Sequence, residues 1–164
     1  MNRIIAILTV FLLQLACMQV ASAQNNVIVA MHAFKVVTTA AGTKLVPTGA
    51  AQPGDTIEYQ VTYSNNGTTL ARDVLATLPV PTSGLVYIAD SAMPAAVQAS
   101  ADGVNYALTP LTRTVTRNGK AVVEAIPVTE YRFLRWKLGD IKPGKSSTVS
   151  SRMRLDSAEV NVRS

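Results

Sequence analysis

The sequence of 164 residues contains one cysteine and one histidine, and aromatic side chains make up only 5% of it. Cys17 lies in an N-terminal segment that we expect to be removed, so the remaining chain has no thiol for a disulfide or a nucleophile. His32 lies in an apolar stretch, and we interpret it as a packed or edge residue rather than a catalytic base. One histidine without cysteine cannot make a zinc site of the usual kind. The composition therefore argues against disulfide scaffolds and against thiol and zinc enzymes.

Charge is also scarce, because charged residues make up 15% of the chain and 15 basic residues face 10 acidic ones, a net charge of +5. The charges are dispersed, which is typical of a solvated surface and not of nucleic-acid binding, although weak attraction to anionic envelope polymers is compatible with them. The aspartates lack the spacing of a calcium loop, no G-x-S-x-G motif occurs, and no carboxylate pair stands out as that of a glycosidase. We therefore predict no metal, no cofactor and no catalytic residues.

The longest fully apolar run, Ile4–Leu13, is also short. It has about half of the ~20 residues that a membrane-spanning helix needs. Arg3 precedes it and the small residues Ala21–Ala23 follow, which is the pattern of a cleaved secretory signal peptide. We predict a signal helix over residues 1–23, membrane contact only before its cleavage, and export to the periplasm, the cell envelope or the exterior.

Cys17 raises the alternative of a lipid anchor, because a lipidated cysteine would tether the chain to a membrane. Polar Gln14 lies where a lipoprotein signal normally carries an aliphatic residue, so cleavage after Ala23 fits better. The mature chain, residues 24–164, then forms a single domain that depends on a packed core for its stability.

Valine and threonine are abundant, and the clearest pattern is the strict alternation of "TIEYQVTY", Thr56–Tyr63. This period of two predicts a strand with Ile57, Tyr59, Val61 and Tyr63 on a buried face and Thr56, Glu58, Gln60 and Thr62 on a wet face. "PG" before the segment and "SNNG" after it are turn signals, because proline fixes φ and glycine and asparagine tolerate turn conformations.

Further segments of the same kind predict about eight to ten short strands, typical of an antiparallel β-sandwich. We expect strands or strand-like pieces at Asn26–Val37, Leu70–Pro79, Gly84–Ser91, Ala95–Ser100, Tyr131–Leu138 and the "STVSSRMRL" segment up to Leu155. Asn26–Val37 is apolar on both faces, which predicts a central strand or one between two sheets.

An Asn118–Gly119 pair within Leu111–Ala125 predicts a tight two-residue hairpin turn. Counting outward from it pairs Val115 with Val122, Arg113 with Glu124 and Arg117 with Lys120. The basic tip from Arg117 to Lys120 is the place where we would first look for binding.

The segment "GDIKPGKS", Gly139–Ser146, matches the letters of a phosphate-binding loop. That chemistry needs a helix after the loop, but the residues that follow alternate like a strand, and Pro143 removes one N–H donor. We interpret the segment as a turn between strands.

The order of these features resembles the conserved-repeat domain of bacterial and archaeal surface proteins, domain of unknown function eleven, over about residues 53–155. The positions that carry the resemblance are Pro53, Gly54, Asp55, Tyr59, Val61, Asn65, Gly67, Val74, Leu78, Pro79, Trp136, Leu138, Gly139, Pro143 and Gly144. Ala76 and Thr77 replace the acidic residue that many members carry, and residues 95–130 are longer than a minimal repeat.

The resemblance implies an immunoglobulin-like sandwich with a structural or adhesive role and with no known catalytic residues. We expect a structural or interaction module whose partners are other envelope proteins or surface polymers. The alternative is a subunit that associates through edge strands, with Asn26–Val37 as a donated strand, and a remote alternative is a secreted hydrolase.

Overall fold

The computed structural model describes residues 26–156, and the predicted signal peptide lies outside them. The described chain is all-β, and each named strand pair is antiparallel. The strands are β1 (Val27–Thr39), β2 (Gly42–Pro47), β3 (Thr56–Asn65), β4 (Ala71–Pro79), β5 (Leu85–Tyr87), β6 (Gln98–Ser100), β7 (Ala107–Leu108), β8 (Thr112–Arg117), β9 (Lys120–Ala125), β10 (Phe133–Ile141) and β11 (Ser146–Leu155). One turn of 3-10 helix, η2 (Val128–Glu130), precedes β10.

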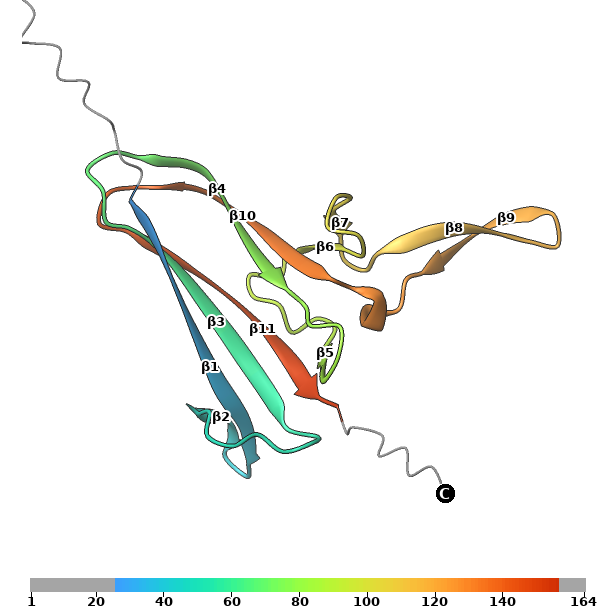
Figure 1. Cartoon of the computed structure of the whole chain (residues 1–164), viewed down its shortest axis with the longest axis horizontal. Coiled ribbons are helices and arrows are strands. Elements are labelled where there is room, and N and C mark those ends of the chain that lie inside the picture. The colour runs from blue at the N-terminus through green and yellow to red at the C-terminus, as the bar shows by residue number, and fades with distance from the viewer. Residues whose placement is uncertain (1–25, 157–164) are drawn as a thin grey trace, which may run out of the picture.

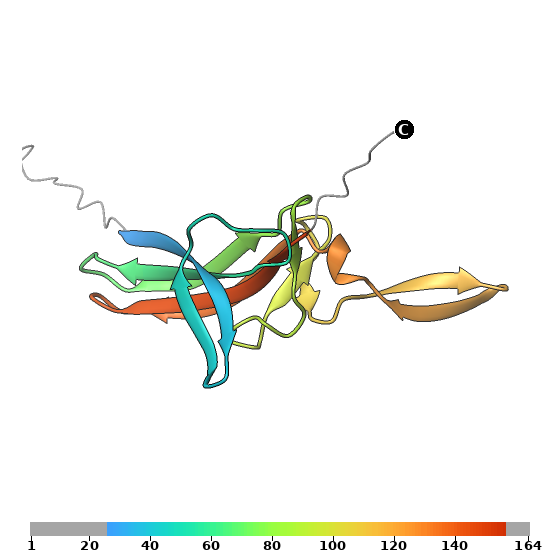
Figure 2. The same cartoon turned by 90° about the horizontal axis from the view of Figure 1, so that it is seen from below.

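The strands form three sheets, two of which lie against each other (Figure 1). The first has the order β2-β1-β3-β11-β5 and the second the order β4-β10-β6-β7. We call these two packed sheets the body. The third sheet is the β8–β9 hairpin, which projects from the body along its long axis (Figure 2). The body is consistent with a β-sandwich, and the all-β antiparallel prediction is confirmed.

The core lies between the two sheets and is built by the alternating residues of β3, β4, β10 and β11. Leu134 and Trp136 of β10 are 0% and 2% exposed, and Val149 and Met153 of β11 are each 1% exposed. The indole Nε1 of Trp136 donates a hydrogen bond of 2.9 Å to the carbonyl oxygen of Pro94, which satisfies its only polar atom. The strands expected at Tyr131–Leu138 and up to Leu155 are thus present, and each buries one face.

The predicted wet face of β3 is wrong at one position, because Glu58 is only 7% exposed. The guanidinium Nε of Arg152 donates a hydrogen bond of 2.8 Å to Glu58 Oε2, and Gln60 Nε2 donates one of 2.8 Å to Oε1. The register places Arg152 of β11 directly opposite Glu58. Burial of this carboxylate is tolerated because a charged partner and an amide satisfy it.

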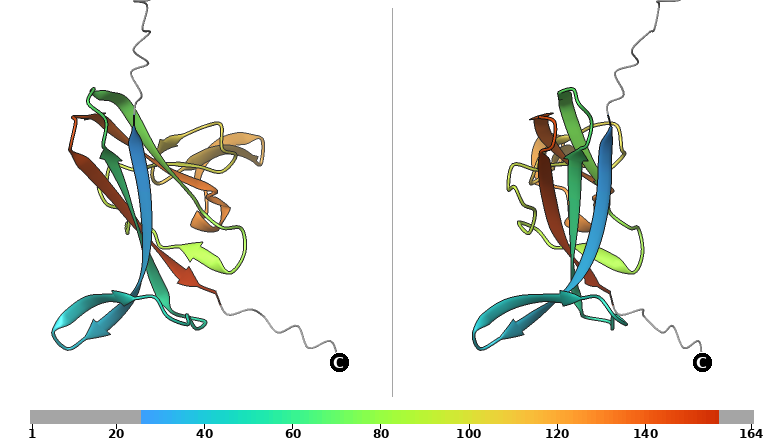
Figure 3. Two further views of the ribbon diagram at one scale, coloured as in Figure 1. Left: turned by 60° about the vertical axis from the view of Figure 1, so that its left-hand side comes forward. Right: turned by 90° about the vertical axis from the view of Figure 1, so that its left-hand side faces the viewer.

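The prediction of a central strand at Asn26–Val37 holds only in part, because β1 lies between β2 and β3 in the sheet order but has both neighbours only at Phe34 and Lys35. β1 pairs with β3 along Val27–Lys35, but β2 covers only its C-terminal half, from Phe34 to Thr39 (Figure 3). Along the uncovered half, Ile28, Val29 and Met31 are 48%, 53% and 59% exposed. Two-sided apolarity therefore marks an overhanging strand here, and β2 was not predicted from the sequence at all.

The hairpin register is confirmed, because Val115 lies opposite Val122, and Arg113 lies opposite Glu124. Other strands are shorter than expected: β5 and β6 have three residues each. No helix among residues 26–156 is long and apolar enough to cross a membrane.

Candidate interaction site

The first "PG" corner fixes the place where β3 begins beside the end of β11. The N–H of Gly54 donates to the Leu155 carbonyl at 2.8 Å, and the N–H of Leu155 donates to the Asp55 carbonyl at 2.8 Å. The Asp55 carboxylate accepts a bond from the Gln52 N–H and an ion pair of 2.7 Å from Lys35 Nζ. Both partners lower the pKa of Asp55 from its ordinary value, and Lys35 has the larger effect. This corner therefore links the start of β3 to the end of β11 and to Lys35 of β1.

Asn65 plays the matching part at the opposite end of the same two strands. Its side-chain Nδ2 donates to the carbonyl oxygens of Thr69 and Ile141 at 2.8 and 2.7 Å, and its Oδ1 accepts from the Gly67 N–H. The Asn65 backbone exchanges bonds with the second "PG" corner, at Gly144 N–H and the Lys145 carbonyl. Asn65 is 1% exposed, so its amide is part of the interior.

The other residues of the motif also have structural positions. Val61, Leu78 and Trp136 belong to the core, with Tyr59 and Leu138 packed against it. Gly139 adopts φ +70° at a bulge of β10, and Gly144 adopts φ +68° in the turn before β11, where glycine avoids the strain of a side chain. The segment Gly139–Ser146 thus runs from strand to turn to strand, as predicted, and Pro143 lies in that turn. The structure shows no helix N-terminus there.

Among the described residues, the fold does not bring histidine and carboxylate side chains together into a catalytic or metal-binding cluster. Within residues 26–156, no cluster of three histidine, cysteine, aspartate or glutamate side chains is placed to hold a metal ion. His32 lies on the exposed half of β1, with its ring centroid 6.4 Å from that of Phe34, so it is an edge residue. The Asp102 carboxylate is occupied by a turn, where it accepts bonds from the N–H groups of Val104 and Asn105.

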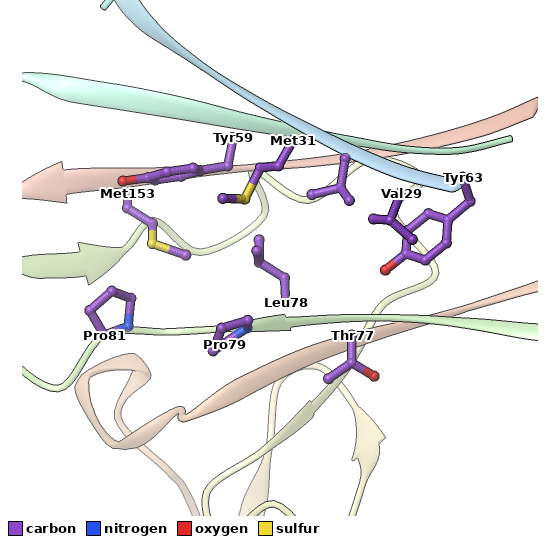
Figure 4. Close-up of a pocket in the computed structure, with 10 residues that line it drawn as sticks. Val29, Met31, Tyr59, Tyr63, Thr77, Leu78, Pro79, Pro81 and Met153 are labelled. Carbon is purple, nitrogen blue, oxygen red and sulfur yellow. The ribbon is translucent and has the colours of Figure 1, made fainter. Parts of the chain in front are cut away.

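The site that sequence reasoning missed is a groove of about 410 Å³ between β1 and β4 (Figure 4). Val29 and Met31 of β1 form one wall, and β4 with the following proline, Pro81, forms the other. Its floor consists of side chains from β3 and β11, namely Tyr59, Val61, Tyr63 and Met153. The lining carries no charged side chain and only two hydroxyl groups of tyrosine and one of threonine. Such a lining suits an apolar occupant.

The groove exists because, on the side of β4, the five-stranded sheet extends further than the four-stranded sheet. β4 is the edge strand of its sheet, whereas in the other sheet β1 and β2 continue beyond β3. No described strand therefore lies beside β4 to cover the inner face of β1. The exposed Val29 and Met31 are the side chains that such a strand would bury.

The outer edge of β4 pairs with no other described strand, and it borders the groove. The Val80 N–H donates to the Arg132 carbonyl oxygen, so the backbone groups of Val80 face β10. Backbone groups of successive residues in an antiparallel strand point to opposite sides, so those of Pro79, Thr77 and Leu75 face away from β10. Proline at position 79 removes one donor, which is a common protection of edge strands. Burial raises the pKa of Tyr63, and a hydrogen bond between its hydroxyl and the Thr77 backbone partly offsets this rise. The Thr77 N–H thus faces the groove floor, and an added strand would replace its bond to the Tyr63 hydroxyl with one of its own.

The predicted binding tip lies far from this groove, at the end of the β8–β9 hairpin (Figure 1). One face of the hairpin carries an ion network: Arg113 contacts Glu124 at 2.8 Å and Glu130 at 2.9 Å, and Arg117 contacts Glu124 at 2.6 Å. These arginines keep the pKa of Glu124 below its ordinary value, mainly through the hydrogen bond from Arg113. The tip is therefore partly neutralised by the charges at its base.

The opposite face of the hairpin has no charge. The register places three cross-strand pairs on it, Thr112 with Ala125, Thr114 with Val123, and Thr116 with Ala121. All six residues are exposed, and Val123 is 67% exposed. We call these six residues the uncharged face. The only hint of it in the sequence is the alternation of threonine with arginine and valine before Asn118.

No family model matches the chain, and comparisons with curated proteins and with solved structures gave no significant match either.

Proposed function

We propose that the chain is a non-catalytic interaction module of an exported protein, with an immunoglobulin-like sandwich as its scaffold. The groove between β1 and β4 binds an extended apolar segment of a partner protein of the cell envelope or exterior. The segment lies beside β4 as an additional strand and covers Val29 and Met31. The resemblance of residues 53–155 to a surface-protein repeat supports the envelope setting and the immunoglobulin-like fold.

One observation carries the proposal: the apolar groove opens onto a strand edge that pairs with no other described strand. Strand addition needs both parts, since edge backbone groups supply the hydrogen bonds and pockets for alternate side chains supply specificity. Thr77 supplies an edge N–H, and Val29 and Met31 supply the apolar contact. The cavity volume lies within the usual range of about 300–1,000 Å³ for binding pockets.

The same observation changes the role that we expected for Asn26–Val37. β1 is paired with β3 of its own chain over nine residue pairs, so its donation to a neighbour would first break that ladder. β1 acts instead as a wall of the receiving groove. Strand addition remains the mechanism, with this chain as acceptor.

The proposal is tested with the mature chain, beginning at Gln24, labelled with ¹⁵N and methyl ¹³C. The probe is a synthetic octapeptide of alternating valine and threonine with a lysine at each end. We expect saturable shifts of the Leu75 and Thr77 amides and of the Val29 and Met31 methyl groups. Shifts confined to other strands, or no saturable shifts, would contradict it.

A pair of variants separates strand addition from nonspecific hydrophobic contact. Thr77→Pro removes the outward N–H of β4 but leaves its pairing with β10 intact, whereas Thr77→Val keeps the N–H and changes only the side chain. We expect the proline variant to weaken peptide binding at least about tenfold, as the loss of a hydrogen bond and its geometry predicts. The valine variant should bind about as well as the unmodified chain.

A further inference from the structure

The groove between β1 and β4 excludes a partner with two layers. β1 extends past β4, directly opposite the place where the added strand would lie. Suppose that β4 of a second copy paired with this edge. The five-stranded sheet of that copy would then have to occupy the layer in which β1 of the first copy already lies. The occupant must therefore be a single layer, either a lone strand or a hairpin without a second sheet behind it.

The chain itself contains such an element in the β8–β9 hairpin. Neither strand pairs with any other described strand, so both outer edges are free, and the uncharged face is exposed. Six residues per strand span about 20 Å at ~3.3 Å per residue, enough to cover the groove face of β1 from Val29 to Met31. The uncharged face matches the charge-free lining of the groove, and Val123 at its centre is an exposed apolar side chain.

The hairpin is also fixed in a defined direction. An isolated two-stranded hairpin is only marginally stable in water, yet this one is braced at its base. Leu111, at its start, is 6% exposed, and its N–H donates to the Tyr131 hydroxyl at 2.8 Å. The N–H of Ile126, at its end, donates to the Leu111 carbonyl at 2.8 Å. Together with the arginine–glutamate network, this base keeps the uncharged face available for contact.

We propose that the β8–β9 hairpin of one copy docks in the β1–β4 groove of a second copy, with its uncharged face on Val29 and Met31. This rests on the proposed function of the groove. The hairpin belongs to the end of the body beyond β7, whereas the groove lies at the β4 edge of the same sheet. The contact is therefore head-to-tail, and repetition gives open chains of molecules or a closed ring.

The mature chain has no cysteine, because Cys17 lies in the predicted signal peptide, so engineered thiols report the contact directly. The variants are Met31→Cys in the groove and Val123→Cys on the uncharged face. Equal amounts are mixed and oxidised with copper–phenanthroline and dissolved oxygen, and the disulfide dimers are separated by mass. We expect the mixed Met31–Val123 dimer to exceed the sum of both same-variant dimers by at least fivefold. The double variant should give a ladder of higher oligomers.

A matched control uses Thr43→Cys in place of Val123→Cys, because Thr43 is exposed on the other projecting ribbon, β1–β2. This mixture should give the random proportions of the three dimers. A second reporter, Thr116→Cys on the uncharged face, should also cross-link to Met31→Cys and should lose that product when Val123→Asp is added.

Random proportions for the Met31 and Val123 mixture would overturn the proposal, as would an excess of either same-variant dimer. The peptide titration distinguishes this from failure of the groove itself. If the octapeptide binds but the mixed dimer is not enriched, the groove receives another partner and the hairpin is not its occupant. If neither occurs, both proposals fail.

Discussion

The body and the β8–β9 hairpin use the same alternating sequence pattern but obtain their stability in different ways. In β10, the alternation places Leu134 and Trp136 between two sheets, where they are almost fully buried. In the hairpin, Val115 alternates with threonines just as regularly and lies opposite Val122, yet Val122 remains 41% exposed because no second sheet covers it. Alternation thus predicts a strand and its pleat, whereas burial depends on what lies opposite.

The largest expected difference between the two regions comes from removing one apolar side chain in each. Trp136→Ala should lower the free energy of unfolding by about 3–5 kcal/mol, because it leaves a cavity and the Pro94 carbonyl without its donor. Val122→Ala should change it by less than about 0.5 kcal/mol, as is usual for surface positions. Urea unfolding followed by far-UV circular dichroism measures both. Equal losses would mean that the hairpin is packed as the body is.

Replacing one asparagine in each region, Asn65 in the body and Asn118 in the hairpin turn, tests the same comparison with a smaller expected effect. Asn65→Ala removes an internal amide with three hydrogen bonds, so the global free energy of unfolding should fall by about 2–3 kcal/mol. Asn118→Ala affects a residue at φ 52° in the hairpin turn, and should cost about 1 kcal/mol that is felt only locally. We expect faster amide hydrogen exchange in β8 and β9 without a change in the global unfolding midpoint. Exposed Asn66→Ala is the control for the body and should be neutral.

The smallest expected effect is a loss of stability of the β8–β9 hairpin at acidic pH. The pKa of Glu124 is lowered in the folded hairpin, so its ion pairs stabilise the hairpin above its ordinary pKa of 4.5 and lose that effect as the pH falls below it. Hydrogen exchange in β8 and β9, corrected for the intrinsic rate, should therefore be less protected at low pH, while β10 retains its protection. Glu124→Gln should remove the pH dependence of this protection. Protection that stays constant for the unmodified chain would contradict the role of the network.

The hairpin shows how much local sequence can predict. Asn118–Gly119 fixes a two-residue turn, and the turn alone sets every cross-strand pair up to Arg113 and Glu124. β3, β10 and β11 were predictable for the same reason, since their alternation and flanking corners are local. The structural reading of Gly139 and Gly144 likewise follows from the pattern around them.

The groove and the buried Glu58 were not predictable because both depend on contacts distant in sequence. Glu58 is buried because β11 places Arg152 opposite it, 94 residues further along the chain. The groove depends on which sheet extends further, and no segment of β1 or β4 encodes that by itself. The one usable signal was the two-sided apolarity of Asn26–Val37, which fits an overhanging strand as well as a central one.

The braces at Gly54 and Asn65 have a mechanical consequence. β1 starts beside the end of β3, and β11 ends beside its beginning, so Val27 and Leu155 lie at opposite ends of the first sheet. A force that pulls these two residues apart acts along the strands, across ladders whose hydrogen bonds are perpendicular to it. The bonds then resist together in shear instead of opening one after another, so the first sheet should withstand tension applied between these two residues.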